Sequence, residues 1–258
     1  MKRTIVSYMV ATIVSLAAIG ALSMQPTSIM AQPEGTGIAP ACGMVVKGNV
    51  TLTSNLNCSG DGLIVGDDGS TINLNGYSIT GPGAHSNKVA IMVPNTDDVS
   101  IVGPGSLRDF QAGVLITGSD NVKVSSLNLQ DNEIAVFMTG TGGTKMDENV
   151  IKDNTLGTAA HSGKSIIISN NLFSGNRLAG ATFVNTAKSE ISMNNIQGSE
   201  NGVFVDTQSK DNVITHNNAF QNTLDLNNGN GLPPNINNNS YQDNNCQTSN
   251  PSGLCIGR

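Results

Sequence analysis

A small residue followed by a short apolar run recurs through the chain about every 22 residues. The runs read GLIV, AIMV, GVLI, AVFM, ATFV and GVFV. The small residues are Gly62, Ala90, Gly113, Ala135, Ala159, Ala181 and Gly202, with Leu224 at the next expected place. A repeat of this length indicates stacked units of secondary structure, because one such unit cannot bury its apolar surface alone.

The repeated units are strands rather than helices. Each apolar run is only three to five residues long, rich in β-branched residues, and bounded by Gly, Asn, Asp or Ser, which is typical of short strands separated by turns. Leucine-rich repeats have a similar period, but the LxxLxL pattern followed by NxL is absent. The sequence therefore predicts an all-β fold, a parallel β-helix (solenoid) of about eight coils.

A second pattern places an asparagine three residues after an isoleucine. The asparagines are Asn154, Asn171, Asn194, Asn217 and Asn239. In a β-helix, equivalent residues of successive coils lie about 4.8 Å apart, so we expect these side chains to form one hydrogen-bonded ladder. The first interval in this series is 17 residues and the others are 22 or 23. We attribute the difference to a loop insertion between Gly140 and Asn149.

The four cysteines lie at the two ends of the domain. Cys42 and Cys58 come before the repeats, and Cys246 and Cys255 follow them. In an exported chain this layout predicts two local disulfides that staple the end caps, where unpaired strand edges would otherwise be exposed. Zinc is the alternative, but the chain has no CxxC motif and no histidine cluster.

The N-terminus resembles a secretory signal peptide. Lys2 and Arg3 precede an uncharged apolar run from Ile5 to about Leu22, and small residues typical of a cleavage site lie near Ala31. An uncleaved membrane anchor is the alternative. We predict a signal peptide at 1–31, an N-terminal segment and cap at 32–61, a parallel β-helix at 62–241 and a C-terminal cap at 242–258.

The charge of the chain argues against nucleic acid as a partner. The formal net charge is −6, and removal of residues 1–31 takes away Lys2 and Arg3 and no acid, which gives −8. An acidic, exported chain of this kind belongs outside the cytoplasm, in the cell envelope or the medium, and should not seek nucleic acid.

The repeats between Gly62 and Tyr241, together with the entry segment DGLIVGDDGSTINLNGYSITGPG, resemble secreted right-handed parallel β-helix repeat proteins. This is the pectate-lyase-like superfamily, including its NosD-like branch. The resemblance implies right-handed coiling. It also implies an outer sheet on which family enzymes act on polysaccharides, although this fold carries many unrelated functions.

No family signature for catalysis is present. The chain lacks the Gly-His-Gly and Arg-Ile-Lys motifs of galacturonan hydrolases and the Asp-Pro-His motif of mannuronan epimerases. His161, Lys164 and Arg177 remain as candidates for acid–base chemistry on a uronate, against the alternative of surface residues without a role. We expect no cofactor and no metal site. Calcium is possible, but the acidic pairs Asp67-Asp68 and Asp97-Asp98 lie in turn-like segments that need no metal.

The apolar runs themselves suggest a binding surface. If the first and third residues of each run point inward, the second residues form an outward row that also includes His161. The apolar members of this predicted binding stripe are Ile64, Met92, Leu115, Phe137, Phe183 and Phe204. A parallel strand that is apolar on both faces is normally covered on both faces. We therefore expect this sheet to dock a terminal segment of the chain, a second copy, a partner, or the flat faces of sugar rings.

These observations favour a secreted or cell-envelope β-helix that binds polysaccharide or a surface partner without established catalysis. One alternative is a carbohydrate-active enzyme, a uronate polysaccharide lyase or C5-epimerase acting on the outer sheet. The other is a purely structural or adhesive surface rod.

Overall fold

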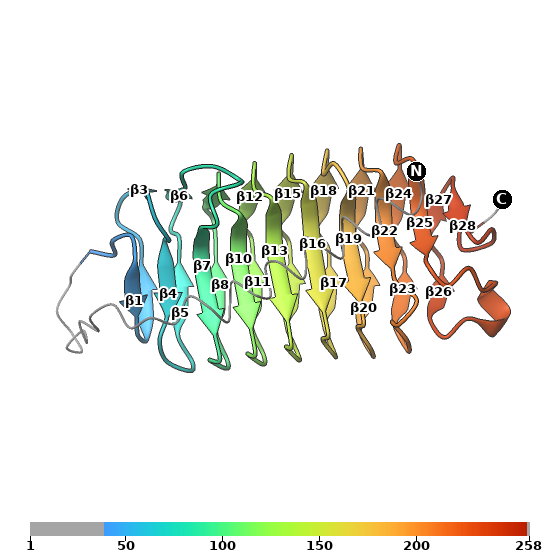
Figure 1. The fold of residues 1–258 in the computed structure, drawn as a ribbon, viewed down its shortest axis with the longest axis horizontal. Coiled ribbons are helices and arrows are strands. Elements are labelled where there is room, and N and C mark those ends of the chain that lie inside the picture. Colours follow the sequence, from blue (N-terminus) through green and yellow to red (C-terminus); the bar gives the residue numbers. More distant parts are fainter. Residues whose placement is uncertain (1–38, 257–258) are drawn as a thin grey trace.

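The computed structural model describes residues 39–256 and arranges them as a right-handed parallel β-solenoid (Figure 1). Three parallel sheets of ten, nine and nine strands run the length of these residues. This gives about nine coils, one more than the predicted eight. The predicted signal peptide, residues 1–31, lies outside the described residues.

Sheet 1 contains the longest strands, most of them with five or six residues. Its strands are, in order along the rod, β1 (Met44–Val46), β4 (Leu63–Val65), β7 (Val89–Pro94), β10 (Ala112–Thr117), β13 (Ile134–Thr139), β16 (Leu156–His161), β19 (Ala179–Val184), β22 (Asn201–Val205), β25 (Leu224–Asn228) and β28 (Ser249–Asn250). The strands of this sheet thus begin before the predicted boundary at residue 62 and continue past residue 241.

Sheets 2 and 3 consist of strands of two or three residues. Sheet 2 contains β2 (Asn49–Thr51), β5 (Thr71–Asn73), β8 (Ser100–Val102), β11 (Lys123–Ser125), β14 (Lys145–Asp147), β17 (Ile167–Ser169), β20 (Glu190–Ser192), β23 (Val213–Thr215) and β26 (Ser240–Gln242). Sheet 3 contains β3 (Leu56–Asn57), β6 (Ser78–Thr80), β9 (Ser106–Arg108), β12 (Asn128–Gln130), β15 (Val150–Lys152), β18 (Leu172–Ser174), β21 (Asn195–Gln197), β24 (Asn218–Phe220) and β27 (Asn245–Cys246). In most of these strands the middle residue is buried inside the coil and its neighbours are at least partly exposed. A single 3₁₀ turn among the described residues, η1 (Pro234–Ile236), interrupts the last full coil.

The corners between the sheets require the left-handed backbone conformation. At the corner from sheet 2 to sheet 3, Ser126, Glu148, Asn170, Met193 and His216 have φ values between 54° and 58°. Asn, Asp and Gly adopt this conformation at least cost. Of the 20 described non-glycine residues with positive φ, 12 are Asn or Asp, so the abundance of these residue types between the strands follows from the geometry of the coil.

Buried asparagines form a separate ladder at each corner rather than the single ladder that we predicted. Between sheets 2 and 3, the side-chain amide of each member donates to the Oδ1 atom of the next at 2.9 to 3.1 Å. This ladder comprises Asn149, Asn171, Asn194, Asn217 and Asn244. Asn132, Asn154 and Asn176 form a second ladder between sheets 3 and 1, and Asn212 with Asn239 begins a third between sheets 1 and 2.

The prediction therefore placed residues of three different corners in one series. Asn154 and Asn239 belong to other ladders than Asn171, Asn194 and Asn217, and this mixing produced the 17-residue interval. The predicted insertion at Gly140–Asn149 is wrong, because Ile134 pairs with Leu156 at the regular spacing. Among the described residues, the longest interval between neighbouring sheet 1 strands is instead the one from β4 to β7. Its extra residues lie between β6 and β7.

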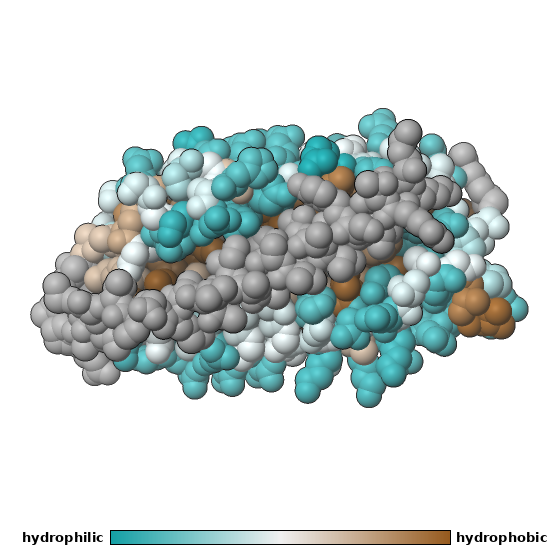
Figure 2. Space-filling model, in the orientation of Figure 1, coloured by the Kyte–Doolittle hydropathy of each residue, from teal (hydrophilic) through white to brown (hydrophobic). Residues whose placement is uncertain are grey.

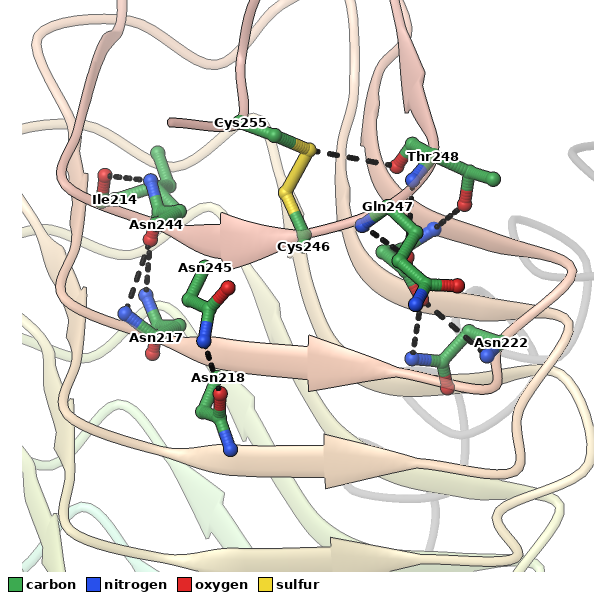
Figure 3. Close-up of a disulfide and its surroundings, with 11 residues drawn as sticks. Ile214, Asn217, Asn218, Asn222, Asn244, Asn245, Cys246, Gln247, Thr248 and Cys255 are labelled. Atoms are coloured by element: carbon green, nitrogen blue, oxygen red, sulfur yellow. Dashed lines mark hydrogen bonds between the residues drawn. A yellow bond between two sulfur atoms is a disulfide. The ribbon is translucent and has the colours of Figure 1, made fainter. Parts of the chain in front are cut away.

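The two predicted disulfides are present. Cys42 bonds Cys58 beside the first coil, and Cys246 in β27 bonds Cys255. Figure 3 shows that the second disulfide ties the C-terminal segment to the last coil, next to the asparagine ladder that ends at Asn244. Asp225 supports the same end, because its buried carboxylate accepts hydrogen bonds from the backbone of Gln247 and Thr248.

Replacing Asn194 by alanine should lower the free energy of unfolding by about 2–4 kcal/mol. The substitution leaves the carbonyl groups of Ile168 and Ser192 and the neighbouring ladder amides without their partners inside the protein. Urea denaturation measures the loss. Asn195→Ala, at an exposed position next in sequence, is the control and should change stability little. Equal effects of the two substitutions would contradict the ladder.

Replacing Met193 by asparagine should stabilise the protein by about 0.5–1 kcal/mol. Met193 has φ +54° and is 57% exposed, so it bears the cost of the left-handed conformation without gaining burial. Thermal unfolding of Met193→Asn and of Met193→Ala separates the effect of the backbone conformation from the effect of removing the exposed methionine side chain. A gain in the alanine variant equal to that in the asparagine variant would show that backbone conformation is not the cause.

Candidate functional site

Sheet 1 differs from the other two sheets because its strands are buried on both faces. All but the last residue of β7, β10, β13 and β16 are buried. The inward side chains belong to the core of the coil, whereas the outward ones form a second, separate apolar cluster. The strands of residues 39–256 all lie in the three sheets, and none forms a second layer over this outward face.

Most sheet 1 strands have a small residue at a position where the backbone of the next coil lies close. A Cβ atom built on Gly113 would lie 2.6 Å from the carbonyl oxygen of Ala135 in the next coil, so a larger side chain has no room there. In two coils the residues at this position are Gly157 and Gly180. Our prediction placed Ala159 and Ala181 there, two positions and one position too late.

The outward face of sheet 1 consists of two main columns that run along the rod. The inner-edge column contains the first residue of each strand from β7 to β25: Val89, Ala112, Ile134, Leu156, Ala179, Asn201 and Leu224. The central column contains Ile64, Met92, Leu115, Phe137, Ala159, Thr182, Phe204 and Asn227. On the side of the molecule seen in Figure 2, separate patches of apolar residues are visible towards the middle, between hydrophilic residues at the upper and lower margins.

Two members of the predicted binding stripe are therefore misplaced. Phe183 pairs with Ala160 and Val205 and is fully buried in the core, so it points inward. His161 lies at the end of β16, beside Thr139 and Val184, and not in the central column. The error at Phe183 follows from a slip of one residue, which moves a side chain to the opposite face. The error at His161 follows from a slip of two residues, which moves the predicted position from Ala159 to the end of the strand.

The remaining stripe residues lie where the pattern placed them relative to the coil. Ile64, Met92, Leu115, Phe137 and Phe204 all belong to the central column. Met92, Leu115, Phe137 and Phe204 are buried, and Ile64 is partly buried.

One edge of this face carries a pair formed by a histidine and a carboxylate that the sequence did not reveal. The loop between β6 and β7 reaches along the rod over the following coils (Figure 1) and places His85 Nδ1 3.2 Å from Glu133 Oε2. The Glu133 side chain is only 6% exposed, whereas that of His85 is 85% exposed. Asp61 binds Lys88 at the base of the same loop. The only sequence signal was the 28-residue interval between Gly62 and Ala90.

The three predicted catalytic residues do not come together. His161 and Lys164 lie at the edge where the sheet 1 strands end, with His161 Nδ1 3.4 Å from the Thr139 hydroxyl. Lys164 lines an open cleft of about 430 Å³ with Asp120 and Asn185. Arg177 lies at the opposite edge, where it precedes β19 and its N–H donates to Asn154.

The described residues hold no group of three or more His, Cys, Asp or Glu positioned to bind a metal ion. Asp68 and Asp97 instead each accept a backbone N–H from the next coil at 2.8 and 2.7 Å. Burial raises the pKa of the Tyr241 hydroxyl, but this side chain packs against the interior near the C-terminal end and is not part of the outward face of sheet 1.

The fold and this face define the class, a right-handed parallel β-solenoid with one apolar outer sheet. A family model described as "Right handed beta helix region" matches residues 112–256, more than half of the sequence. The chain therefore belongs to the right-handed β-helix family. None of the curated proteins searched matches it.

Solved structures with similar folds include two kinds of protein. DFA-IIIase from Arthrobacter chlorophenolicus A6, in complex with GF2, has a TM-score of 0.56 and 15% identity over 76% of this chain and 55% of its own. The enzymatically active domain of tailspike protein 2 from bacteriophage CBA120 has a TM-score of 0.52 and 13% identity over 81% of this chain and 36% of its own. The chain thus matches about half or less of these proteins, and the likeness concerns the fold.

The corrected register predicts opposite outcomes at two positions that the pattern had placed in one row. Phe183→Ala should lower the free energy of unfolding by about 3–5 kcal/mol, because it leaves a cavity in the core. His161→Ala should change stability by less than about 0.5 kcal/mol. Chemical denaturation of both variants checks this, and a tolerated Phe183→Ala would contradict the inward orientation.

Proposed function

We propose that the chain is exported and binds polysaccharide along the outward face of sheet 1 without catalysing a reaction on it. The observation that carries the proposal is the central column, whose members Leu115, Phe137 and Phe204 point outward. These side chains are at most 2% exposed, so a glycan reaches them only when this face is uncovered. Aromatic and aliphatic side chains pack against the apolar faces of sugar rings. Because the column runs parallel to the rod, a linear glycan can meet equivalent positions in successive coils.

The polar groups beside the central column favour a glycan as the ligand over a lipid-like or a strongly charged partner. Polar side chains border it at both edges, among them Glu133 and His85 on one side and Thr139 and His161 on the other. An apolar floor with a few polar groups at its margins is the usual lining of a small-molecule site. The similar structure in complex with GF2 has the same overall fold.

The two disulfides support export, because such bonds persist in oxidising compartments. No helix within residues 39–256 is long and apolar enough to cross a membrane. Cleavage after Ala31 would leave a chain that begins at Gln32, and every described strand lies between Met44 and Asn250. That chain retains every strand of residues 39–256.

The enzymatic alternative, a uronate lyase or C5-epimerase, gains no support from the arrangement of His161, Lys164 and Arg177 at opposite edges. A structural rod and self-association through the central column are the remaining alternatives, and one experiment distinguishes all of them. The chain from Gln32 is incubated with alginate, pectate, a glycosaminoglycan and neutral glycans, with and without calcium, and followed by NMR.

We expect line broadening of at least one glycan and no new sugar signals. Phe137→Ala should weaken that binding about ten-fold, as loss of a central aromatic contact does. Because Phe137 is fully buried, the substitution should also lower the free energy of unfolding by about 3–5 kcal/mol, so binding is measured at a temperature at which the variant is folded. Leu172→Ala, a partly exposed apolar residue on the outer face of sheet 3, is the matched control and should bind like the unaltered chain.

New unsaturated or epimerised sugar signals would overturn the proposal in favour of an enzyme. Absence of binding to every glycan would overturn it in favour of a structural rod. In that case sedimentation would show whether the central column joins two copies.

A further inference from the structure

Three asparagines of the chain lie in the sequence Asn-X-Ser/Thr, the acceptor motif for N-linked glycans in exported proteins. They are Asn49 (NVT), Asn57 (NCS) and Asn238 (NNS). Asn250 (NPS) is excluded as an acceptor, because proline follows it. The long segment between Asn57 and Asn238 holds most of the asparagines of the chain and none of these motifs. The motifs are thus confined to the first and last coils.

The three acceptor side chains are exposed and unbonded. Asn49, Asn57 and Asn238 lie at the surface, and their side-chain amides make no hydrogen bond within residues 39–256. The ladder asparagines, such as Asn171 and Asn194, are buried and use their amides to bind neighbouring coils. A glycan attached at one of the three motifs therefore breaks no contact of the fold, whereas one attached in a ladder would.

The interior strands of sheets 2 and 3 carry parts of the motif but never the whole. In sheet 2, β11 (KVS), β17 (IIS), β20 (EIS) and β23 (VIT) end on Ser or Thr but do not begin with Asn. In sheet 3, β12 (NLQ), β21 (NIQ) and β24 (NAF) begin with Asn but end on Gln or Phe. The first residue of each of these strands is at least partly exposed. The coil could therefore present the complete motif at many places, yet the motif occurs only at the ends.

The strands at these ends have a free edge. β2, which contains Asn49, and β3, which contains Asn57, are the first strands of sheets 2 and 3, and Asn238 precedes β26, the last strand of sheet 2. Figure 1 shows β3 and β26 at opposite ends of the rod. Among the described residues, each of the three strands pairs along one edge only. The N–H and C=O groups of a free edge are a template for another strand, and a head-to-tail contact of this kind would build open filaments.

We propose that Asn49, Asn57 and Asn238 of the exported chain carry N-linked glycans, and that these glycans prevent copies of the rod from joining end to end. An N-linked glycan is bulky and solubilising, and the strand of an added copy would lie about 4.8 Å from the strand that carries it. Glycans on Asn49 and Asn57 shield one end, and the glycan on Asn238 shields the other. The inference rests on the export of the proposed function but not on its polysaccharide binding.

The modification is a glycosyl transfer from a lipid-linked oligosaccharide phosphate of the exporting cell. The Nδ2 atom of the asparagine forms a bond to the anomeric carbon of the oligosaccharide. The bond between that carbon and the phosphate oxygen breaks, the lipid phosphate leaves with the electron pair, and one amide proton is released. The chain supplies only the acceptor amide and the Ser or Thr hydroxyl of the motif.

Mass spectrometry of the chain recovered from outside the cells that naturally produce it tests the modification. Peptides that contain Asn49, Asn57 and Asn238 should each be heavier by a glycan, and chemical deglycosylation should remove the added mass. The peptide that contains Asn250 is the control and should have no added mass. Exported chain with all three peptides unmodified would overturn the inference and leave export intact. Chain found only inside the cells would remove export and the inference together.

Sedimentation velocity tests the role of the glycans. A variant that combines Asn49→Gln, Asn57→Gln and Asn238→Gln, exported from the same cells, should form larger species that grow with concentration, whereas the unaltered chain should sediment as single copies. The variant should keep the melting temperature, because the three side chains are exposed and unbonded.

A matched control adds Lys123→Asn to this variant. The substitution completes the motif at an exposed position of β11, in the middle of the rod, and so restores a glycan without shielding an end. This control should still associate. A combined variant that sediments as single copies would overturn the shielding role. Association that the glycan at position 123 abolishes would also overturn it, because the position of the glycan would then not matter.

Discussion

The in-register stacking of the coils is the constraint on which the rest of this structure depends. Each strand pairs only with its equivalents in the preceding and following coils, so every side chain lies in a column of equivalent side chains. A residue type that suits one coil then suits the next. Asn171, Asn194 and Asn217 satisfy one another in this way, as do the aliphatic residues inside.

The same stacking makes the inside and the outside of sheet 1 interdependent. In the inward column Met138, Ala160 and Phe183 alternate in size, which lets the large ring fill the space left by the alanine. In the outward column the small residues Ala159 and Thr182 lie between Phe137 and Phe204. The outward side chains of the central column are thus smallest in the middle coils, between the two phenylalanines.

Sequence reasoning identified the fold, the parallel stacking and both disulfides, because the period, the strand composition and the positions of the cysteines depend on local chemistry. It failed where two assignments were nearly equivalent. Ala159 and Ala181 fit a small-residue pattern as well as Gly157 and Gly180 do, and only the pairing of Leu156 with Ile134 and with Ala179 decides between them. The three corners likewise all favour asparagine, so one series could not be separated from another without the register.

The candidate site was predictable only in part for the same reason. Leu115, Phe137 and Phe204 were recognisable as one outward row from their positions in the apolar runs. Thr182 was not, because the slip of one residue moved Phe183 into the row in its place. The pairing of His85 with Glu133 depends on a loop that crosses from one coil to another, which no local pattern shows.

The central claim is that glycans bind the outward face of sheet 1, and methyl NMR tests it most directly. Outward and inward methyl groups alternate along the same strands, as in Leu115 beside Val114 and Ile116, or Ala159 beside Ala160. When the chain from Gln32 is titrated with a glycan that it binds, the outward methyl signals should shift and their inward neighbours should stay in place. Shifts confined to sheets 2 and 3 would contradict the account.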